Sequence, residues 1–181
     1  MKEISLNILD ITENSVKAGA TLTEIYVDEA GDTLTLTIKD DGCGMTEETV
    51  KSVTDPFYTT RTTRKVGLGI PLLKLACEQT GGTLSIISSV DDDTHGTTVT
   101  AVFFKNHIDF TPLGDVISSI VTLIQGHPNT DFLFRHSTKR GAVELDTREI
   151  RAVLDDVPLD TYEVILWIRD NLEEQYKEIS I

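Results

Sequence analysis

The chain has 181 residues, of which 39% are hydrophobic and 25% charged, the composition of an ordinary folded protein. Its net charge of −14 is shared equally: residues 1–105 hold 9 Lys/Arg against 16 Asp/Glu, and residues 106–181 hold 7 against 14. Since nucleic acids and anionic membranes are bound through basic patches, this charge argues against both as partners.

The cysteine spacing indicates a reducing compartment, and the distribution of apolar residues argues against export and membrane insertion. Cys43 and Cys77 have neither the spacing of a zinc site nor a disulfide framework. No apolar run is long enough for a signal peptide or a membrane span. We therefore expect a cytoplasmic protein that is not embedded in a membrane.

The first 105 residues predict a complete α/β unit. Ile4, Ile8 and Ile11 recur at helical spacing, in a segment that Ala18-Gly-Ala20 ends. Alternating β-branched residues on either side of a turn then predict a hairpin. In chain order we expect a helix at about 2–17, strands at 24–28 and 33–39, helices at about 46–53 and 70–80, and strands at 83–90 and 97–104.

Residues 106–181 predict a smaller αββαα appendage. We expect a helix at about 113–124, a hairpin pairing 131–135 with 142–145, and helices at 147–155 and 161–176. Two of these helices carry apolar stripes, which usually face a core. The stripes are Val116, Ile117, Ile120, Val121 and Ile124 in the first, and Val164, Ile165, Ile168 and Leu172 in the last. Since neither can bury itself alone, we expect packing on the hairpin or on a second copy of the chain, and a role in partner docking or dimerisation.

One face of the first helix carries Asn14 with Asp10 one turn earlier. Magnesium takes near-octahedral oxygen ligands and is usually held by one or two protein oxygens together with phosphates and water. The Asn14 amide can supply one such oxygen, and the Asp10 carboxylate can polarise a water molecule that attacks a terminal phosphate. Glu13 is interpreted as a surface carboxylate.

The run Asp40-Asp-Gly-Cys-Gly44 follows a predicted strand. Glycine allows positive φ and lets the backbone approach a planar ligand. A carboxylate at this position can accept a hydrogen bond from the amino group of adenine, which selects adenine over guanine. Alone, the run would be interpreted as a strand-ending turn; paired with the Asn14 helix, it indicates a nucleotide site.

A cationic loop precedes the next helix, with Arg61, Arg64 and Lys65 ahead of Gly67-Leu-Gly69. Unpaired amide groups at a helix start, together with cations, can bind a triphosphate. Neither a Walker loop nor a Rossmann glycine motif is present.

Together these motifs resemble the GHKL superfamily, which includes gyrase, the ATP-driven heat-shock chaperone, histidine kinases and mismatch-repair MutL. Residues 13–21 (ENSVKAGAT) and Asp41-Gly-Cys-Gly-Met45 are similar to the MutL-type boxes, whereas 55–61 (DPFYTTR) and Gly67-Leu-Gly-Ile70 are similar to the phenylalanine and glycine boxes of histidine kinases. The resemblance covers residues 1–105. It implies a two-layer α/β sandwich, the Bergerat ATP-binding fold, with ATP and Mg²⁺ as cofactors.

The resemblance also implies roles residue by residue. Asp10 would be the catalytic residue, Asn14 the magnesium ligand and Asp40 the adenine ligand, with Thr98 as a water-mediated adenine contact. The remaining nucleotide contacts would be Ala18, Gly42, Gly44, Met45, Arg61, Lys65, Gly67, Leu68 and Gly69.

Two positions depart from the family pattern. The usual catalytic Glu is replaced by Asp10, which is one methylene shorter, and Lys65 occupies the first glycine position of the histidine-kinase glycine box. The first change could slow hydrolysis or signal that phosphotransfer or mere binding is the function.

The family resemblance leaves two classes of function open. No phosphoacceptor hairpin precedes the Asn14 helix in this sequence, and the size is closest to stand-alone regulatory kinases of the anti-sigma type. We expect either a regulatory ATPase or protein kinase acting on a partner protein, or a non-catalytic ATP-gated interaction module.

Overall fold

The computed structural model describes residues 3–54 and 68–179, so the sequence-predicted contacts Arg61, Lys65 and Gly67 lie outside the described residues. Twelve elements are described. They are α1 (Ile4–Lys17), β1 (Leu22–Ala30), β2 (Thr33–Asp40), α2 (Glu47–Ser52), α3 (Gly69–Gln79), β3 (Thr83–Ser89), β4 (Gly96–Phe104), α4 (Val116–Gly126), β5 (Asp131–Thr138), β6 (Gly141–Asp146), α5 (Thr147–Leu154) and α6 (Tyr162–Ile179).

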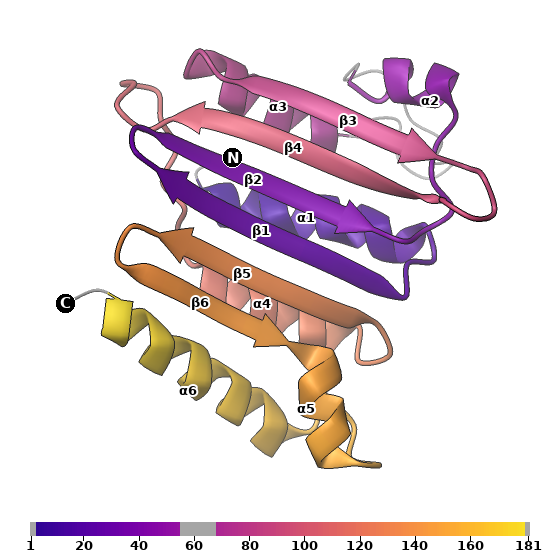
Figure 1. The fold of residues 1–181 in the computed structure, drawn as a ribbon, viewed down its shortest axis with the longest axis vertical. Coiled ribbons are helices and arrows are strands. Elements are labelled where there is room, and N and C mark those ends of the chain that lie inside the picture. The colour runs from indigo at the N-terminus through magenta and orange to yellow at the C-terminus, as the bar shows by residue number, and fades with distance from the viewer. Residues whose placement is uncertain (1–2, 55–67, 180–181) are drawn as a thin grey trace.

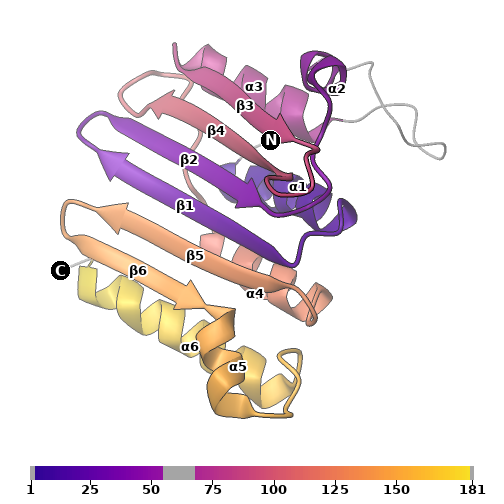
Figure 2. The ribbon, with the colours of Figure 1, turned by 45° about the vertical axis from the view of Figure 1, so that its right-hand side comes forward.

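The strands form one mixed sheet in the order β3-β4-β2-β1-β5-β6 (Figure 1). Neighbouring strands are antiparallel except β1 and β5, which run parallel. Helices α1, α3 and α4 lie against one face of this sheet, and Figure 2 shows all three behind the strands. The predicted two-layer α/β sandwich is therefore confirmed.

The core lies between this sheet face and the helices. Alternate residues of each central strand point toward the helices and are buried, as Ile25 and Val27 are in β1 and Leu36 and Ile38 in β2. The helical spacing of Ile4, Ile8 and Ile11 aims α1 at the same layer, where each is at most 3% exposed. Burying side chains of this size contributes about 1.5–3 kcal/mol each.

The C-terminal strands continue the sheet rather than starting another. β5 pairs with β1 over seven residue pairs, from Leu22 with Asp131 to Asp28 with Ser137. The apolar stripes of α4 and α6 are covered within this chain, since α4 packs on α1 and β5, and α6 packs on β6 and α4. The sheet is thus continuous across the boundary near Lys105, and the division into an ATP-binding unit (1–105) and an accessory unit (106–181) stays a proposal about function.

A line of polar contacts also fixes α6 to the sheet. The Tyr176 hydroxyl lies 2.8 Å from Nδ1 of His136, whose Nε2 lies 3.1 Å from a Glu29 carboxylate oxygen. The other Glu29 oxygen accepts a 2.9 Å hydrogen bond from Lys105. Burial lowers the pKa of His136 and outweighs the contrary effect of Glu29. This network joins α6, β5, β1 and the end of β4.

Within residues 3–54 and 68–179, no helix has both the length and the apolar character needed to cross a bilayer.

Candidate functional site

Asp40 is the last residue of β2 and points to the helix side of the sheet, as Leu36 and Ile38 do before it. Its Oδ2 accepts a 2.6 Å hydrogen bond from the Ser15 hydroxyl of α1. Its Oδ1 accepts from the backbone N–H groups of Gly42 at 3.0 Å and Thr97 at 3.2 Å. A carboxylate offers about four acceptor positions, so these three bonds orient the group and leave room for one further donor.

The neighbouring Asp41 has a different role. Its Oδ1 accepts from the backbone N–H groups of Thr21 at 2.7 Å and Leu22 at 2.9 Å, and its Oδ2 accepts from the Thr21 hydroxyl. Burial alone would raise the pKa of Asp41, but these hydrogen bonds bring it below its usual value. Asp41 therefore fixes the start of β1 with both carboxylate oxygens, whereas Asp40 keeps one acceptor position for a further donor.

The turn after Asp40 needs glycine at two points. Gly44 has φ of +70°, and a Cβ there would lie 1.7 Å from the carbonyl oxygen of Ser89. Gly96, which faces the turn from β4, has φ of +134°, and its Cβ would lie 2.1 Å from the carbonyl oxygen of Asp40. Only residues without a side chain allow three backbone segments to approach this closely.

Further contacts fix the turn against α1 and β3. The N–H of Cys43 donates to the carbonyl oxygen of Ala18 at 2.9 Å, and a Cβ on Gly42 would lie 2.9 Å from the Ala18 Cβ. The N–H of Met45 donates to the Ser88 hydroxyl at 2.8 Å. Four of the sequence-predicted residues, Ala18, Gly42, Gly44 and Met45, thus lie in one compact corner with Asp40.

The exposed side of α1 meets the start of α3. A Cβ built on Gly69 would lie 3.6 Å from Asn14 Nδ2 and 3.6 Å from Asp10 Cβ, so the first residue of α3 faces both predicted phosphate-side residues. Asp10 is exposed and Asn14 is half-buried. The N-terminus of an 11-residue helix carries partial positive charge, which favours phosphate beside Asp10 and Asn14.

This arrangement fits the cofactors that the sequence predicts. Asn14 offers a neutral amide oxygen to magnesium, and the remaining ligands of such an ion would come from phosphate and water. In the part of the chain that the structure describes, no group of three or more His, Cys, Asp or Glu side chains could hold a metal ion. Among the sequence-predicted residues, Asn14 is the one that would contribute a protein oxygen to such an ion.

Thr98 does not lie with the other predicted residues. It pairs with Lys39 in the β2–β4 ladder, and alternation places its side chain on the face opposite to Val99 and the helices. Thr97, its neighbour, is the residue that pairs with Asp40 and donates to it. Thr97 is therefore the threonine that lies beside Asp40 in the folded chain. The alternation of apolar residues at 99, 101 and 103 is a sequence signal that places residue 97 on this face.

Sequence reasoning also passed over two serines and a histidine at this corner. Ser15 orients Asp40, and the Ser88 hydroxyl donates to the carbonyl oxygen of Gly96 at 2.9 Å and lies 2.8 Å from the Thr97 hydroxyl. His95 Nδ1 lies 2.8 Å from the carbonyl oxygen of Gly42. Beside the turn is a shallow cleft of about 390 Å³, lined by Ala18, Gly19, Asp41, Gly42, Cys43, Val90, Asp92 and His95.

Glu13 is more than the surface carboxylate that we expected. Its Oε1 lies 2.6 Å from His127 Nε2, just after α4, and its Oε2 lies 3.2 Å from the Lys17 ammonium. The hydrogen bond with His127 is the largest influence on the Glu13 carboxyl and lowers its pKa. Glu13, which precedes Asn14 in α1, thus links α1 to the accessory unit.

Three comparisons with known proteins show the family to which residues 2–108 are similar. Residues 2–108 match the family model described as histidine kinase-, DNA gyrase B- and HSP90-like ATPase. A putative sensor protein of Shewanella frigidimarina (strain NCIMB 400) is 32% identical over 91 residues, and sporulation kinase B of Bacillus subtilis (strain 168) is 30% identical over 100 residues. These matches cover 48% and 55% of this chain but only 14% and 22% of those relatives.

Among solved structures, the N-terminal domain of a DNA repair protein is similar, with a TM-score of 0.60 at 15% identity. The similarity covers 81% of this chain and 52% of that one, and at this identity it concerns the fold alone. The family match itself spans more than half of the chain and contains the Asn14 helix and the Asp40 turn. The chain therefore belongs to the family of histidine kinase-, DNA gyrase B- and HSP90-like ATPases.

Proposed function

We propose that this protein binds Mg-ATP between α1, the turn after β2 and the start of α3, and uses it as a regulatory ATPase or protein kinase acting on a partner protein. The observation that carries the proposal is the Asp40 carboxylate, which Ser15, Gly42 and Thr97 orient while leaving one acceptor position open. The amino group of adenine is a donor that matches this position, whereas guanine presents a carbonyl oxygen there.

The proposed position of the ATP phosphates is based on Asn14 and Asp10 of α1. With adenine at Asp40, the phosphates would extend toward Asn14 and the N-terminus of α3, whose first residue, Gly69, lies beside Asn14. Bound magnesium would supply charge neutralisation for phosphate chemistry. Asp10, one helical turn from Asn14 and exposed, would accept a proton from the attacking water or hydroxyl group.

The length of Asp10 supports an alternative function. Its carboxylate is one methylene shorter than the Glu usual in the family, so it reaches less far toward the phosphates. If the proton transfer fails for this reason, the protein is a non-catalytic ATP-gated interaction module. In that case ATP changes the affinity for a partner without being consumed.

The two possibilities differ in turnover. Purified protein incubated with magnesium and γ-labelled ATP should release phosphate, or label a partner protein, and Asp10→Asn should reduce this by about 100-fold, the usual contribution of a positioned base. Asp32→Asn is a matched control, because Asp32 is an exposed aspartate at the other end of the β1–β2 hairpin from Asp40. ATP binding without turnover in the wild type would favour the alternative, and no ATP binding would refute both.

A further inference from the structure

The outer side of α6 carries large apolar side chains in water. Tyr162 is 69% exposed, Leu166 40% and Trp167 54%. The buried side of the same helix is already filled by Val164, Ile165, Ile168 and Leu172. The exposed residues are therefore surplus to the packing of this chain, and aromatic residues of this kind are enriched in the energetic centres of protein interfaces.

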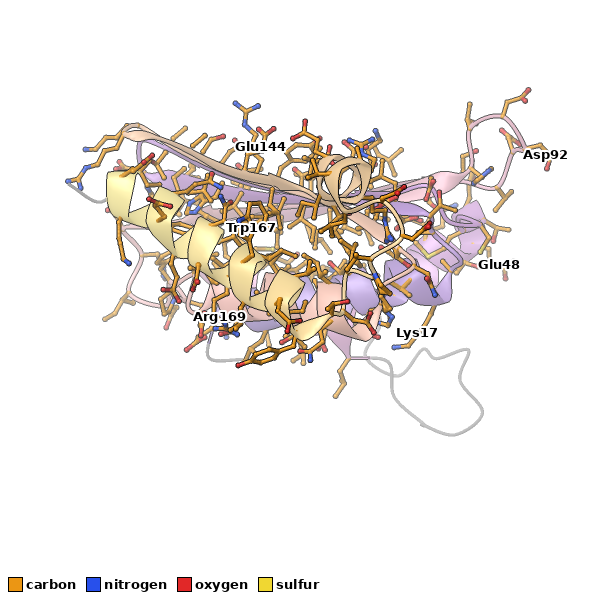
Figure 3. The ribbon with its side chains drawn as sticks, turned by 90° about the horizontal axis from the view of Figure 1, so that it is seen from below. Lys17, Glu48, Asp92, Glu144, Trp167 and Arg169 are labelled. Carbon is orange, nitrogen blue, oxygen red and sulfur yellow. The ribbon has the colours of Figure 1, made fainter. Side chains whose placement is uncertain are left out.

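The helix presents these residues from a fixed position. Figure 3 shows Trp167 on the side of α6 toward β6 and Arg169 on the side toward the helix layer. Arg169 contacts the Ser118 hydroxyl of α4, at 3.4 Å. Tyr176 and His136 fix the far end of α6 to the sheet. These contacts thus attach α6 to the rest of the chain through residues outside the α6 surface, which is defined here by Tyr162, Leu166 and Trp167.

Acidic residues surround the α6 surface. Residues 155–178 hold eight Asp/Glu against two Lys/Arg, a net charge of −6 within a chain of −14. On α6 itself, Glu163, Asp170 and Glu174 are exposed on the same outer side. An apolar centre with an acidic rim matches a partner surface that has apolar anchors among lysines and arginines.

A second copy of the chain fits this surface poorly. Two α6 surfaces facing each other would bring like charges together, at a cost in affinity. Pairing through the edge of β6 is also opposed, because the Gln175 side chain bonds both the N–H and the carbonyl oxygen of Glu144, at 2.9 and 3.0 Å. The negative charge around α6 and the capped backbone of Glu144 therefore favour a different protein over self-association.

We propose that the α6 surface docks a cationic amphipathic segment of a partner protein, with Leu166 and Trp167 as its apolar anchors. The proposal concerns the accessory unit and does not require the ATP site to be functional. Its test contains no nucleotide, so its outcome is independent of the proposed ATPase or kinase activity.

Trp167 is the only tryptophan in the sequence, so its fluorescence reports directly on this surface. The probe is a synthetic peptide of about 18 residues containing only leucine and lysine, with the leucines at helical spacing. On titration, the emission of the full chain should move to shorter wavelength and saturate. A peptide with the same composition but scattered leucines, and one with glutamate in place of lysine, should each bind at least about tenfold more weakly.

Variants locate the binding. Leu166→Ser should weaken the binding of the leucine–lysine peptide about tenfold. Val153→Ser should leave that affinity unchanged, since Val153 is an 85% exposed valine on α5, outside the α6 surface. Unfolding curves establish that both variants fold. Absence of a fluorescence change, equal binding of the glutamate peptide, or equal affinity in Leu166→Ser would overturn the proposal. So would sedimentation showing a dimer that Leu166→Ser dissociates, because the occupant would then be a second copy.

Discussion

Hydrogen bonds and glycines hold the corner around Asp40, whereas apolar side chains hold the accessory helices. At the corner, Ser15, Gly42 and Thr97 all bond one carboxylate, and Gly44 and Gly96 allow the backbone to pass within van der Waals distance. In α4 and α6, stripes of Ile, Leu and Val fill the space beneath β5 and β6. A polar corner of this kind depends on individual residue identities, while an apolar layer depends mainly on volume and pattern.

The same difference governs what each region can do. A carboxylate fixed by three donors recognises a ligand by the direction of one remaining hydrogen bond. The outer side of α6 in the accessory unit offers apolar area and negative charge instead. We therefore expect the corner to select a small molecule and α6 to select a protein surface.

Truncation of the accessory core should give the largest effect on stability. Ile168 is fully buried in α6, and Ile168→Ala should cost about 2–5 kcal/mol of unfolding free energy through lost burial and the remaining cavity. Urea unfolding measures this. Because β5 and β1 share hydrogen bonds, Trp167 fluorescence and far-ultraviolet circular dichroism should report one coincident transition. Separate transitions would mean that the two units unfold independently.

Substitution of a glycine at the corner should have the next largest effect on stability. Gly44→Ala places a Cβ against the Ser89 carbonyl at positive φ, and we expect a loss of about 2–4 kcal/mol from the strained backbone and the overpacking together. Gly31→Ala is the matched control, since Gly31 also has positive φ, +55°, but nothing lies within 4 Å of the added Cβ. Its loss should be about 1–2 kcal/mol, from the left-handed backbone alone. Equal losses in urea unfolding would remove the special status of the corner.

Removal of the Ser15 hydroxyl should affect the ligand more than the fold. Ser15→Ala leaves Asp40 with one hydrogen bond fewer, and we expect ATP affinity to fall about tenfold, as measured by isothermal titration calorimetry. Thr98→Val is the control, because Thr98 lies on the other face of the sheet. A stronger effect of Thr98→Val than of Ser15→Ala would contradict the placement of the site.

Loss of the Glu13–His127 contact, which links the two regions, should have the smallest effect on stability. The folded-state pKa of Glu13 lies below its ordinary value of 4.5 because of His127, so its contribution to stability is present above pH 4.5 and is lost as the pH falls through the lowered pKa. Glu13 is partly exposed, and we expect Glu13→Gln to cost no more than about 1 kcal/mol at pH 7. The difference from wild type should shrink as the pH falls below 4.5 and through the lowered pKa of Glu13; a difference that grows there would refute the assignment.

Sequence patterns predicted most of the fold because its elements are marked by local signals. The helical period of Ile4, Ile8 and Ile11 and the alternation in β1 and β2 each depend on neighbouring residues only, and all the elements predicted within the described residues are present. The predicted ends of the elements were less accurate. β5 continues to Thr138 and α6 to Ile179, because strand pairing and helix packing extend them. The parallel pairing of β1 with β5 joins residues more than 100 positions apart and has no local signal.

The candidate site was predicted in the same uneven way. Asp10, Asn14, Asp40 and the two glycines of the turn were predicted as site residues because they form motifs at fixed spacing, and those roles stay predictions. Ser15, Ser88 and Thr97 were missed because single hydroxyl residues are common, and their roles depend on three segments that meet only in the folded chain. The choice between Thr97 and Thr98 depended on strand parity, which the printed sequence contains but which needs the strand boundaries to interpret.

Calorimetric titration with ATP and with GTP, in the presence of magnesium, tests the central claim most directly. If Asp40 accepts the hydrogen bond of the adenine amino group, ATP should bind at least about tenfold more tightly than GTP, and Asp40→Ala should reduce ATP affinity by about 1.5–3 kcal/mol, the value of a hydrogen bond to a charged group. Asp32→Asn should leave both affinities unchanged. Equal binding of ATP and GTP, or ATP affinity that Asp40→Ala does not change, would contradict the account.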